Sequence, residues 1–456
     1  MQHTRHLLTK AQQRHADGNL VAAIHLYKRV LKKTPNDPAV LNNLGAALID
    51  IFDYDLAIEA FTRAHEINPD TLGLRNNFAN AHLASGNLSA AAQLFQTALE
   101  QTPTDPVLLK NLGNTLYQSN DYTGAIKCFE DVINQTKNDA AAHCLRGFSH
   151  AALGLLGQCW DEYEWRWDMP NAPSQRDFKA PVWDGTNLGS KKLIIWGEQG
   201  IGDEIMFAGL LNELVKKGGH VSVECDPRLS PLFTRSFKKF QILSTSEHNL
   251  KIKFDAQLPI ASLARYFRKN LKDFRPHSGY LIADHQLSKT LKQRYRQQTG
   301  ASRLIGLSWQ GGSDANRQQR SAALESWAPL LKNMRKGTGF ISLQYGNVKA
   351  EIDQFNRNND QQILHDSEIN PLTNIDAATA QTAAMDMVIT VPNTTAHLAG
   401  ALNVKTWVLH PHRADWIWLL QGNSSPWYPS LKNMRQQRHG DWEEIIDTLT
   451  REFPNL

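Results

Sequence analysis

The sequence lacks an apolar run long enough to span a membrane, and residues 1–8 lack the apolar stretch of a signal peptide. It has only four cysteines in 456 residues, and no two of them form a C-x-x-C pair. Disulfides are uncommon in reducing compartments, and this spacing gives no sign of a disulfide framework. We therefore expect a cytoplasmic chain without a membrane span.

The sequence also lacks a large excess of either sign of charge. The 49 basic side chains barely exceed the 45 acidic ones, and the formal net charge is +4. Nucleic-acid binding normally requires a concentrated basic face, so we expect no nucleic-acid partner. With 41% hydrophobic and 21% charged residues, the composition is that of an ordinary globular protein. A chain of this length is too long for one core and predicts two or three domains.

The first third of the sequence is periodic. Small residues recur at an interval of 34, at Ala23, Ala57, Ala91, Ala125 and Cys159. Large aromatic residues follow four positions later, at Tyr27, Phe61, Phe95, Phe129 and Tyr163. Two antiparallel helices pack closely where a small residue faces a large one, and each helix pair leaves an apolar face for the next. The period therefore predicts a solenoid of five helix pairs.

This pattern resembles the tetratricopeptide repeat, and the resemblance covers residues 4–171. It implies a concave groove that binds a protein or peptide. Asparagine is a poor helix former, so its recurrence on these helices favours groove contacts over plain solvated positions. The candidates are Asn42, Asn43, Asn76, Asn77, Asn80, Asn111 and Asn114. The aromatic residues between Trp160 and Trp167 are expected to cap the solenoid against the next domain.

The period changes after a segment at 172–190 that is rich in proline, glycine, asparagine and serine and has the composition of a linker. Short apolar strands then alternate with helical segments, which predicts doubly wound parallel sheets. Strands are expected near 193–196, 221–224, 240–243, 256–260, 304–309, 339–344, 362–365, 387–391 and 406–410. We expect two Rossmann-like halves, at 191–285 and 303–456, with a ligand cleft beyond the carboxyl ends of their strands.

The loop after the first of these strands, Gly197 to Glu204, is rich in glycine. Gly200 and Gly202 let backbone N–H groups approach an anion at the start of the following helix. Position 205 is isoleucine, so the dinucleotide fingerprint is incomplete and a nicotinamide enzyme is disfavoured.

Asp203, in the same loop, has two interpretations. It can cap the helix, or it can take a proton from an acceptor hydroxyl as a general base. Glu198 and Glu204 are rivals for the role of base.

In the second half, residues 305–312 run from a strand into glycines, and arginines follow. An arginine on such a loop can neutralise a diphosphate as it leaves, or it can simply lie in solvent. Residues 341–346 run from another strand into a loop, which is expected to face the same side of the sheet. The candidates from these two loops are Trp309, Gln310, Gly311, Arg317, Arg320, Gln344 and Tyr345.

A strand at 387–391 leads into a helix whose first turn carries Asn393, Thr394 and Thr395. Hydroxyl groups and exposed N–H groups at a helix start suit a diphosphate. His397, one turn further, is either a contact to phosphate or sugar or a packing residue. His410, after the next strand, is expected to line the same pocket. Together with His412 and Asp415 it does not make a complete metal-ligand set, so we expect no metal.

The Gly-Ile-Gly-Asp loop at 200–203 and these later segments resemble the heptosyltransferase-like (family 9) glycosyltransferases of the two-Rossmann GT-B type. The resemblance covers about 190–456. It implies Asp203 as base and a nucleotide-sugar donor as substrate, without a cofactor. The one D-x-D sequence, at 53–55, falls in a repeat turn, which disfavours a metal-dependent transferase. The chain departs from the family at 392 and 393, where the family usually has aspartate, and its first half is short.

The sequence thus predicts an α-solenoid followed by a GT-B-like double Rossmann domain. The leading hypothesis is an inverting, metal-independent transfer of sugar to a protein held in the repeat groove. Similar fusions glycosylate flagellar or surface proteins of bacteria, which makes these candidate acceptors. One alternative is a protein-binding adaptor with an inactive transferase-like domain, motivated by Pro392. Another is a sugar-nucleotide epimerase on the same scaffold.

Overall fold

The computed structural model describes residues 2–71, 73–170, 172, 176, 178–245, 253–312, 320–438 and 440–452. The chain divides into two compact units, Met1–His150 and Ala151–Leu456. In the described part of the chain, no helix combines the length and apolar character that a membrane crossing demands.

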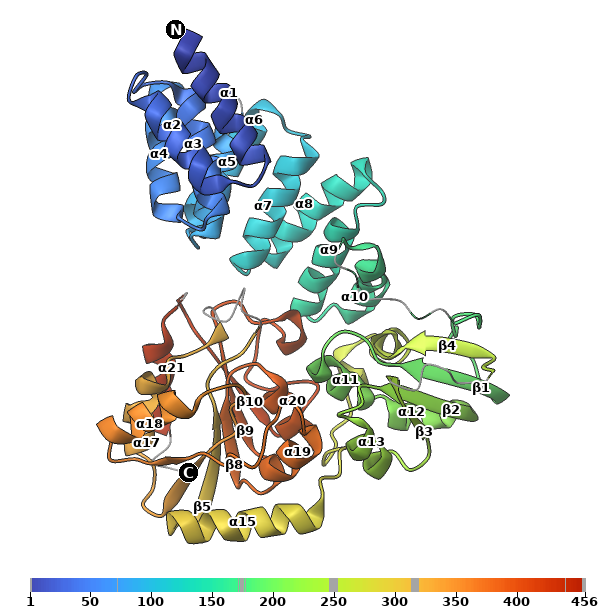
Figure 1. The fold of residues 1–456 in the computed structure, drawn as a ribbon. Helices are drawn as coiled ribbons and strands as arrows, with labels where there is room; N and C mark the ends of the chain where they lie inside the picture. The colour runs from blue at the N-terminus through green and yellow to red at the C-terminus, as the bar shows by residue number, and fades with distance from the viewer. Residues whose placement is uncertain are drawn as a thin grey trace. The chain divides into compact units, whose positions relative to one another are not determined.

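The first unit is built from antiparallel helices alone (Figure 1). They are α1 (Gln2–Ala16), α2 (Leu20–Leu31), α3 (Pro38–Asp50), α4 (Tyr54–Ile67), α5 (Leu74–Ala84), α6 (Leu88–Gln101), α7 (Pro106–Gln118), α8 (Tyr122–Gln135) and α9 (Ala140–Ala152). Asn or Asp begins the second helix of successive pairs at the same interval of 34, at 19, 53, 87 and 121. Each of these side chains accepts a bond from the backbone N–H three residues on, which satisfies an orphan donor at the helix start.

Small residues face large ones throughout this unit. A Cβ atom added at Gly45 would lie 2.6 Å from the ring of Phe61, and one at Gly113 would lie 2.7 Å from the ring of Phe129. Both rings are fully buried. The pairing that the sequence period predicts is therefore confirmed, and with it the solenoid.

The second unit begins with α10 (Leu156–Tyr163) and η1 (Glu164–Asp168) and continues into a four-stranded parallel sheet. Its elements are β1 (Gly189–Trp196), α11 (Ile201–Ala208), α12 (Leu211–Leu214), β2 (Gly218–Cys225), α13 (Ser230–Ser236), β3 (Gln241–Ser244), β4 (Ala256–Pro259), η4 (Ile260–Leu263) and α14 (Ala264–Phe267). The strand order is β3-β2-β1-β4. Helix α11 ends at Ala208, before Gly209, where an added Cβ would lie 2.9 Å from the Tyr280 ring.

A six-stranded parallel sheet follows, in the order β10-β9-β8-β5-β6-β7. Its elements are α15 (His285–Thr299), β5 (Arg303–Ser308), η6 (Leu324–Trp327), α17 (Ala328–Lys332), β6 (Thr338–Ser342), α18 (Lys349–Asn358), β7 (Ile363–Leu364), α19 (Ile375–Ala383), β8 (Met387–Thr390), α20 (Thr394–Ala401), β9 (Thr406–His410), η7 (Trp416–Trp418), β10 (Leu431–Arg435) and α21 (Trp442–Glu452). This is the strand order of a doubly wound sheet, and it places the change of winding direction between β5 and β8.

Strand side chains alternate between the two faces of this sheet. Ile305 and Leu307 pack in one buried cluster with residues of α17, α18 and α21, whereas Leu304 packs on the other face with residues of α15 and α19. Both faces are thus covered, as a parallel sheet requires. The parallel α/β architecture predicted after the repeats is confirmed. Strand β10, which pairs with β9 at the end of the strand order, was not predicted, because its sequence, Leu-Lys-Asn-Met-Arg, has no apolar run.

Candidate functional site

A cavity of about 290 Å³ lies where the carboxyl ends of the two sheets of the second unit face each other. It is lined from the first sheet by the loop and helix start after β1, and from the second sheet by the exits of β5, β6, β8 and β9. Eight residues singled out from the sequence line it: Gly200, Gly202, Asp203, Arg320, Tyr345, Asn393, Thr394 and His397. The strand order predicts this position, since ligands of doubly wound sheets bind where the winding direction changes.

Asp203 lies in the first turn of α11, where its Oδ2 accepts a bond from the Gly200 N–H at 3.2 Å. Burial raises the pKa of its carboxyl group to about 6, and the nearby carboxylates of Asp415 and Glu198 act in the same direction. The group is therefore ionised at neutral pH yet more basic than an ordinary aspartate. A carboxylate of this kind is suited to accept a proton from a bound hydroxyl.

His397 forms part of the opposite wall. Its Nδ1 lies 2.8 Å from the Tyr428 hydroxyl, and burial lowers the pKa of the imidazole to about 4. The side chain is therefore neutral at pH 7. A Cβ atom at Gly202 would lie 3.0 Å from His397 Cδ2, so the glycine lets the loop approach the imidazole closely.

Arg320 carries the positive charge of the cavity. Its guanidinium group pairs with the Asp415 carboxylate, and both residues line the cavity. Because a guanidinium group has five N–H donors, this pairing leaves donors for an anionic ligand.

The start of α20 is organised by Asn393. Its Oδ1 accepts bonds from the N–H groups of Thr395 (2.9 Å) and Ala396 (3.4 Å), and its Nδ2 donates to Ser308 Oγ and the Gln310 carbonyl oxygen. The amide of Asn393 thus joins α20 to the exit of β5. The Asn393 amide makes these hydrogen bonds with other protein groups, so its role here is to hold the start of α20 in place.

A second cavity of about 240 Å³ adjoins the first, and the two share Ile201, Tyr345 and Thr394. Its wall is mainly aliphatic, with Leu343, Pro371, Leu372, Ile375, Ala378 and Leu398. Polar groups enter from Arg228, Gln381, Thr382 and Thr395. Two adjoining chambers result, one polar and one largely apolar.

Several predicted residues support the cavity from behind its wall. Gln344 is buried, and its Oε1 accepts bonds from the N–H groups of Trp309 and Gln310, each at 2.8 Å. The Trp309 side chain is fully buried in the sheet core, and the Gln310 amide donates to Glu351. These contacts fix the backbone at the exit of β5.

Two other predicted residues, His410 and Gly311, also lie outside the cavity lining. His410 is fully buried, with Nε2 2.9 Å from Asn433 Oδ1, and burial lowers the pKa of its imidazole to about 3. Gly311 packs against the loop between β8 and α20, since a Cβ there would lie 2.9 Å from the Pro392 carbonyl oxygen. Arg317 lies outside the described residues.

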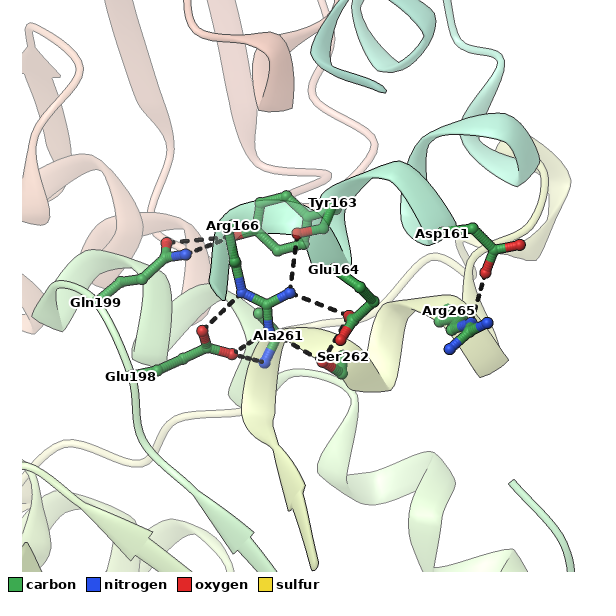
Figure 2. Close-up of polar contacts among 9 residues, drawn as sticks. All are labelled: Asp161, Tyr163, Glu164, Arg166, Glu198, Gln199, Ala261, Ser262 and Arg265. Carbon is green, nitrogen blue, oxygen red and sulfur yellow. Dashed lines mark hydrogen bonds and ion pairs between the residues drawn. The ribbon is translucent and has the colours of Figure 1, made fainter. Parts of the chain in front are cut away.

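Glu198 is held by an arginine that the sequence did not single out. Arg166 Nε and Nη2 donate to the two Glu198 carboxylate oxygens, each at 2.8 Å (Figure 2). The guanidinium group also stacks on the rings of Tyr163 and Trp167, at 4.4 and 4.5 Å from their centroids. Ala261 N–H donates to the same carboxylate. Both oxygens of Glu198 are therefore engaged below the cavity, and the Trp-Arg-Trp sequence carried no recognised signal for this role.

Gln199, between Glu198 and the glycine loop, has a left-handed backbone with φ 62°. Few residues other than glycine adopt this region. Its side-chain amide is bonded to the Tyr163 hydroxyl, with Nε2 at 2.8 Å (Figure 2). The segment 163–166 thus fixes two successive residues immediately before Gly200 and Asp203.

In the first unit, the predicted asparagines link neighbouring repeats to one another. Asn77 Nδ2 donates to Asn42 Oδ1, and Asn111 Nδ2 donates to Asn76 Oδ1, both at 3.0 Å. The bonds join α3 to α5 and α5 to α7. The remaining predicted positions, Asn43, Asn80 and Asn114, are half-buried.

Glu204 provides a test of the electrostatics around the loop. Its Oε2 accepts a bond from Asp226 N–H at 3.0 Å, and burial, with smaller effects from the Asp226 and Glu224 carboxylates, raises its pKa to about 8. The folded state therefore holds a proton that the unfolded chain releases near pH 4.5, so folding stability falls as pH rises from about 4.5 to about 8.

Glu204→Gln keeps the acceptor oxygen and removes this titration. We expect the variant to be more stable than the wild type at pH 8, by about 4 kcal/mol, and nearly equal to it at pH 4.5. Urea unfolding at both pH values measures the difference. The exposed Glu66→Gln serves as control. An E204Q advantage that does not grow with pH would show that Glu204 is already ionised.

Comparison with known proteins supports the repeat assignment. One tetratricopeptide repeat model matches residues 52–106 and 82–147, and a second matches residues 8–70. Residues 8–147 thus carry tetratricopeptide repeats, as predicted. Among solved structures, the chain is similar to the crystal structure of MamA protein, with 21% identity, a TM-score of 0.34 and coverage of 36% of this chain and 90% of that one. It is also similar to MamA from Desulfovibrio magneticus RS-1, with 16% identity, a TM-score of 0.34 and coverage of 35% and 91%.

A curated relative extends beyond the repeats. Protein FlbA of Caulobacter vibrioides is 29% identical over 324 residues, which cover 66% of this chain and 53% of the relative. The chain therefore spans about half the length of that relative. Since two thirds of this chain is about twice the length of Met1–His150, the likeness includes much of the α/β unit.

Proposed function

We propose that the protein is an inverting, metal-independent glycosyltransferase that moves a sugar from a nucleotide-sugar to a hydroxyl group of a protein. One observation carries the proposal: a half-buried carboxylate with a raised pKa, Asp203, lines the same cavity as Arg320 and the start of α20. A base faces a cation and a helix N-terminus, which is the arrangement that transfer from a diphosphate needs.

We place the donor across the two adjoining cavities, with its nucleoside in one and its sugar in the other. Its nucleoside occupies the largely apolar chamber, where Arg228 and Gln381 supply polar contacts. Its diphosphate lies at Thr394, which lines both chambers, and its sugar extends toward Asp203. The parallel sheets and the GT-B-like resemblance agree with this direction.

The chemistry is a single displacement. The acceptor oxygen forms a bond to the anomeric carbon as its proton passes to the Asp203 carboxylate. The bond from that carbon to the phosphate oxygen breaks, and the electron pair leaves with the nucleoside diphosphate. Arg320 and the first turn of α20 stabilise the charge that develops on the leaving group. One attack from the face opposite the leaving group inverts the anomeric centre.

The acceptor is a protein because tetratricopeptide repeats are a protein-binding scaffold. The amides that join α3 to α5 and α5 to α7 place polar side chains at two successive repeat junctions. Such groups suit an extended peptide backbone, and flagellar or surface proteins are candidate acceptors.

A second candidate function is a binding protein whose α/β unit performs no transfer. Two observations favour it: Arg320 is already paired with Asp415, and Asn393 already caps α20 where a diphosphate would bind. Pro392 also stands at a position where the family usually has aspartate. The two candidates differ in whether a nucleotide-sugar binds.

The deciding experiment is a thermal-shift measurement of the whole chain against UDP-, GDP-, ADP-, CMP- and dTDP-sugars. All twelve tryptophans lie after residue 150, so tryptophan fluorescence reports the α/β unit alone. We expect one donor class to raise its melting temperature, since a ligand at 100 times its Kd stabilises the folded state by about 2.7 kcal/mol.

The matched variants are Arg320→Met, which lines the cavity, and Arg438→Met, which is exposed. The shift should shrink in the first and persist in the second. If no donor shifts the transition, the inert binding protein is the better account. If the donor is converted in the absence of an acceptor, the protein is better explained as an epimerase.

A further inference from the structure

The turns within the helix pairs share a left-handed residue at the interval of 34. These residues are Gly18, Phe52, Gly86, Asn120 and Gly154, with φ between 64° and 83°. Glycine and asparagine tolerate this region, whereas a bulky side chain is strained there. Phe52 is nevertheless 77% exposed, so burial of its ring does not offset the strain. The ring meets the Tyr54 ring edge-on, with 6.4 Å between centroids, and most of its surface faces solvent.

A groove lies beside the two helices that this turn joins, with Leu48 before the turn and Leu56 after it in its lining. The cavity there measures about 380 Å³ and is lined by α2, α3 and α4. Leu41, Leu44 and Leu48 of α3 are buried and form its floor, while Leu31 and Leu56 form the apolar parts of its sides. Leu56 is 41% exposed, as is expected of a side chain that borders an open groove.

The rim of this groove is basic. Lys28, Lys32 and Arg63 line it, against a single acid, Glu59. Arg63 donates to the Pro35 carbonyl oxygen at 3.2 Å, which holds its guanidinium group at the rim. Lys28 and Lys32 are exposed and form no ion pair with any residue that the structure describes.

The same positions in later repeats lack this character. One interval after Lys32 stands Glu66, and two intervals after it stands Glu100. Arg63 is followed in the same way by Thr97 and then Asp131. The repeat scaffold therefore does not require basic residues here, and the basic rim belongs to the first groove alone among these three.

We propose that this first groove, formed by α2, α3 and α4, binds an acidic amphipathic peptide segment of a partner protein. Apolar side chains of the segment fill the space over Leu44 and Leu48, and its carboxylates face Lys28 and Lys32. Phe52 provides an exposed ring that becomes covered in the complex. The proposal is independent of sugar transfer, since no residue of the α/β unit takes part.

The test is a selection from random 16-residue peptides displayed on phage, with the full-length chain as target. Selected peptides should combine Asp or Glu with Leu, Ile or Phe at spacings of three or four residues. A labelled selected peptide is then titrated by fluorescence polarisation. We expect Lys28→Glu/Lys32→Glu and Leu56→Asp each to weaken binding by about tenfold or more, because each opposes the contact it replaces.

Two control variants separate binding from folding. Lys127→Glu reverses one lysine charge at an exposed position of the fourth repeat and should leave the affinity within about twofold. Phe52→Gly should weaken binding while it leaves the melting temperature unchanged or higher, since glycine suits the left-handed turn. The proposal is overturned if no acidic apolar peptide is selected or if the Lys28/Lys32 variant binds it equally well. Self-association that this variant abolishes would also overturn it, by making a second copy the occupant.

Discussion

Asp203→Asn is expected to reduce the rate of sugar transfer by about 10²- to 10⁴-fold while the donor still binds. The asparagine has nearly the same volume, and its oxygen can still accept the bond from Gly200 N–H, so the loop and α11 should keep their conformation. What is lost is the ability to take the acceptor proton. The measurement is initial-rate kinetics with the donor identified by thermal shift, with donor affinity determined separately by calorimetry.

The pH profile supplies the signature of this role. The base acts when deprotonated, and burial raises the pKa of Asp203 to about 6. In the wild type, kcat/KM should therefore rise with pH through about 6 and level off above it. The residual activity of Asp203→Asn should lack this rise. Asp161→Asn, which removes an exposed carboxylate from the same unit, should leave both rate and profile unchanged.

Wild-type rates in Asp203→Asn would assign the base elsewhere. Glu198 could then be considered only if its pairing with Arg166 opened, because both of its oxygens are engaged. Glu204 would be the remaining carboxyl group of the loop, but its pKa near 8 leaves it mainly protonated at neutral pH. The environment of the three acids thus separates groups that the sequence left as rivals.

The parts predicted well are those encoded by short-range repetition. The pattern of a small residue four positions before an aromatic one occurs five times. It predicts a helix pair from the local sequence alone. The same holds for the glycine loop after β1 and the polar first turn of α20, where strand, loop and helix are contiguous in sequence. These segments supply most of the cavity lining.

The parts that were missed depend on partners far away in the chain. Strand β10 is defined by its pairing with β9 and has little apolar pattern of its own. Trp309 was placed at the ligand, although its spacing of two from Leu307 puts it on the same face of the sheet and into the core. Arg166 meets Glu198 across 32 positions, which no local motif records.

The pairing of Arg166 with Glu198 leads to the second large prediction. Arg166→Met should destabilise the α/β unit by about 3–5 kcal/mol, because it leaves the Glu198 carboxylate buried without a countercharge. The two side chains are only 5% and 1% exposed, so solvent cannot replace the lost partner. Urea unfolding followed by tryptophan fluorescence measures the effect on this unit.

Arg265→Met is the matched control. It breaks the ion pair with Asp161 (Figure 2). The Arg265 and Asp161 side chains are 45% and 69% exposed. Pairs of that kind contribute about 0–1 kcal/mol. Equal losses in the two variants would mean that the difference in burial does not matter and would contradict the prediction.

The pH dependence distinguishes an unpaired charge from lost packing. The Glu198 pKa is already raised by burial, with Arg166 opposing that shift, so removal of the arginine raises it further. As pH falls, Glu198 in Arg166→Met becomes protonated and no longer needs a countercharge. The destabilisation should therefore shrink toward pH 5, and Arg166→Met/Glu198→Gln should recover part of the loss at pH 8. A loss that is constant with pH and unrelieved by the second substitution would trace instead to the stacking of Arg166 on Tyr163 and Trp167.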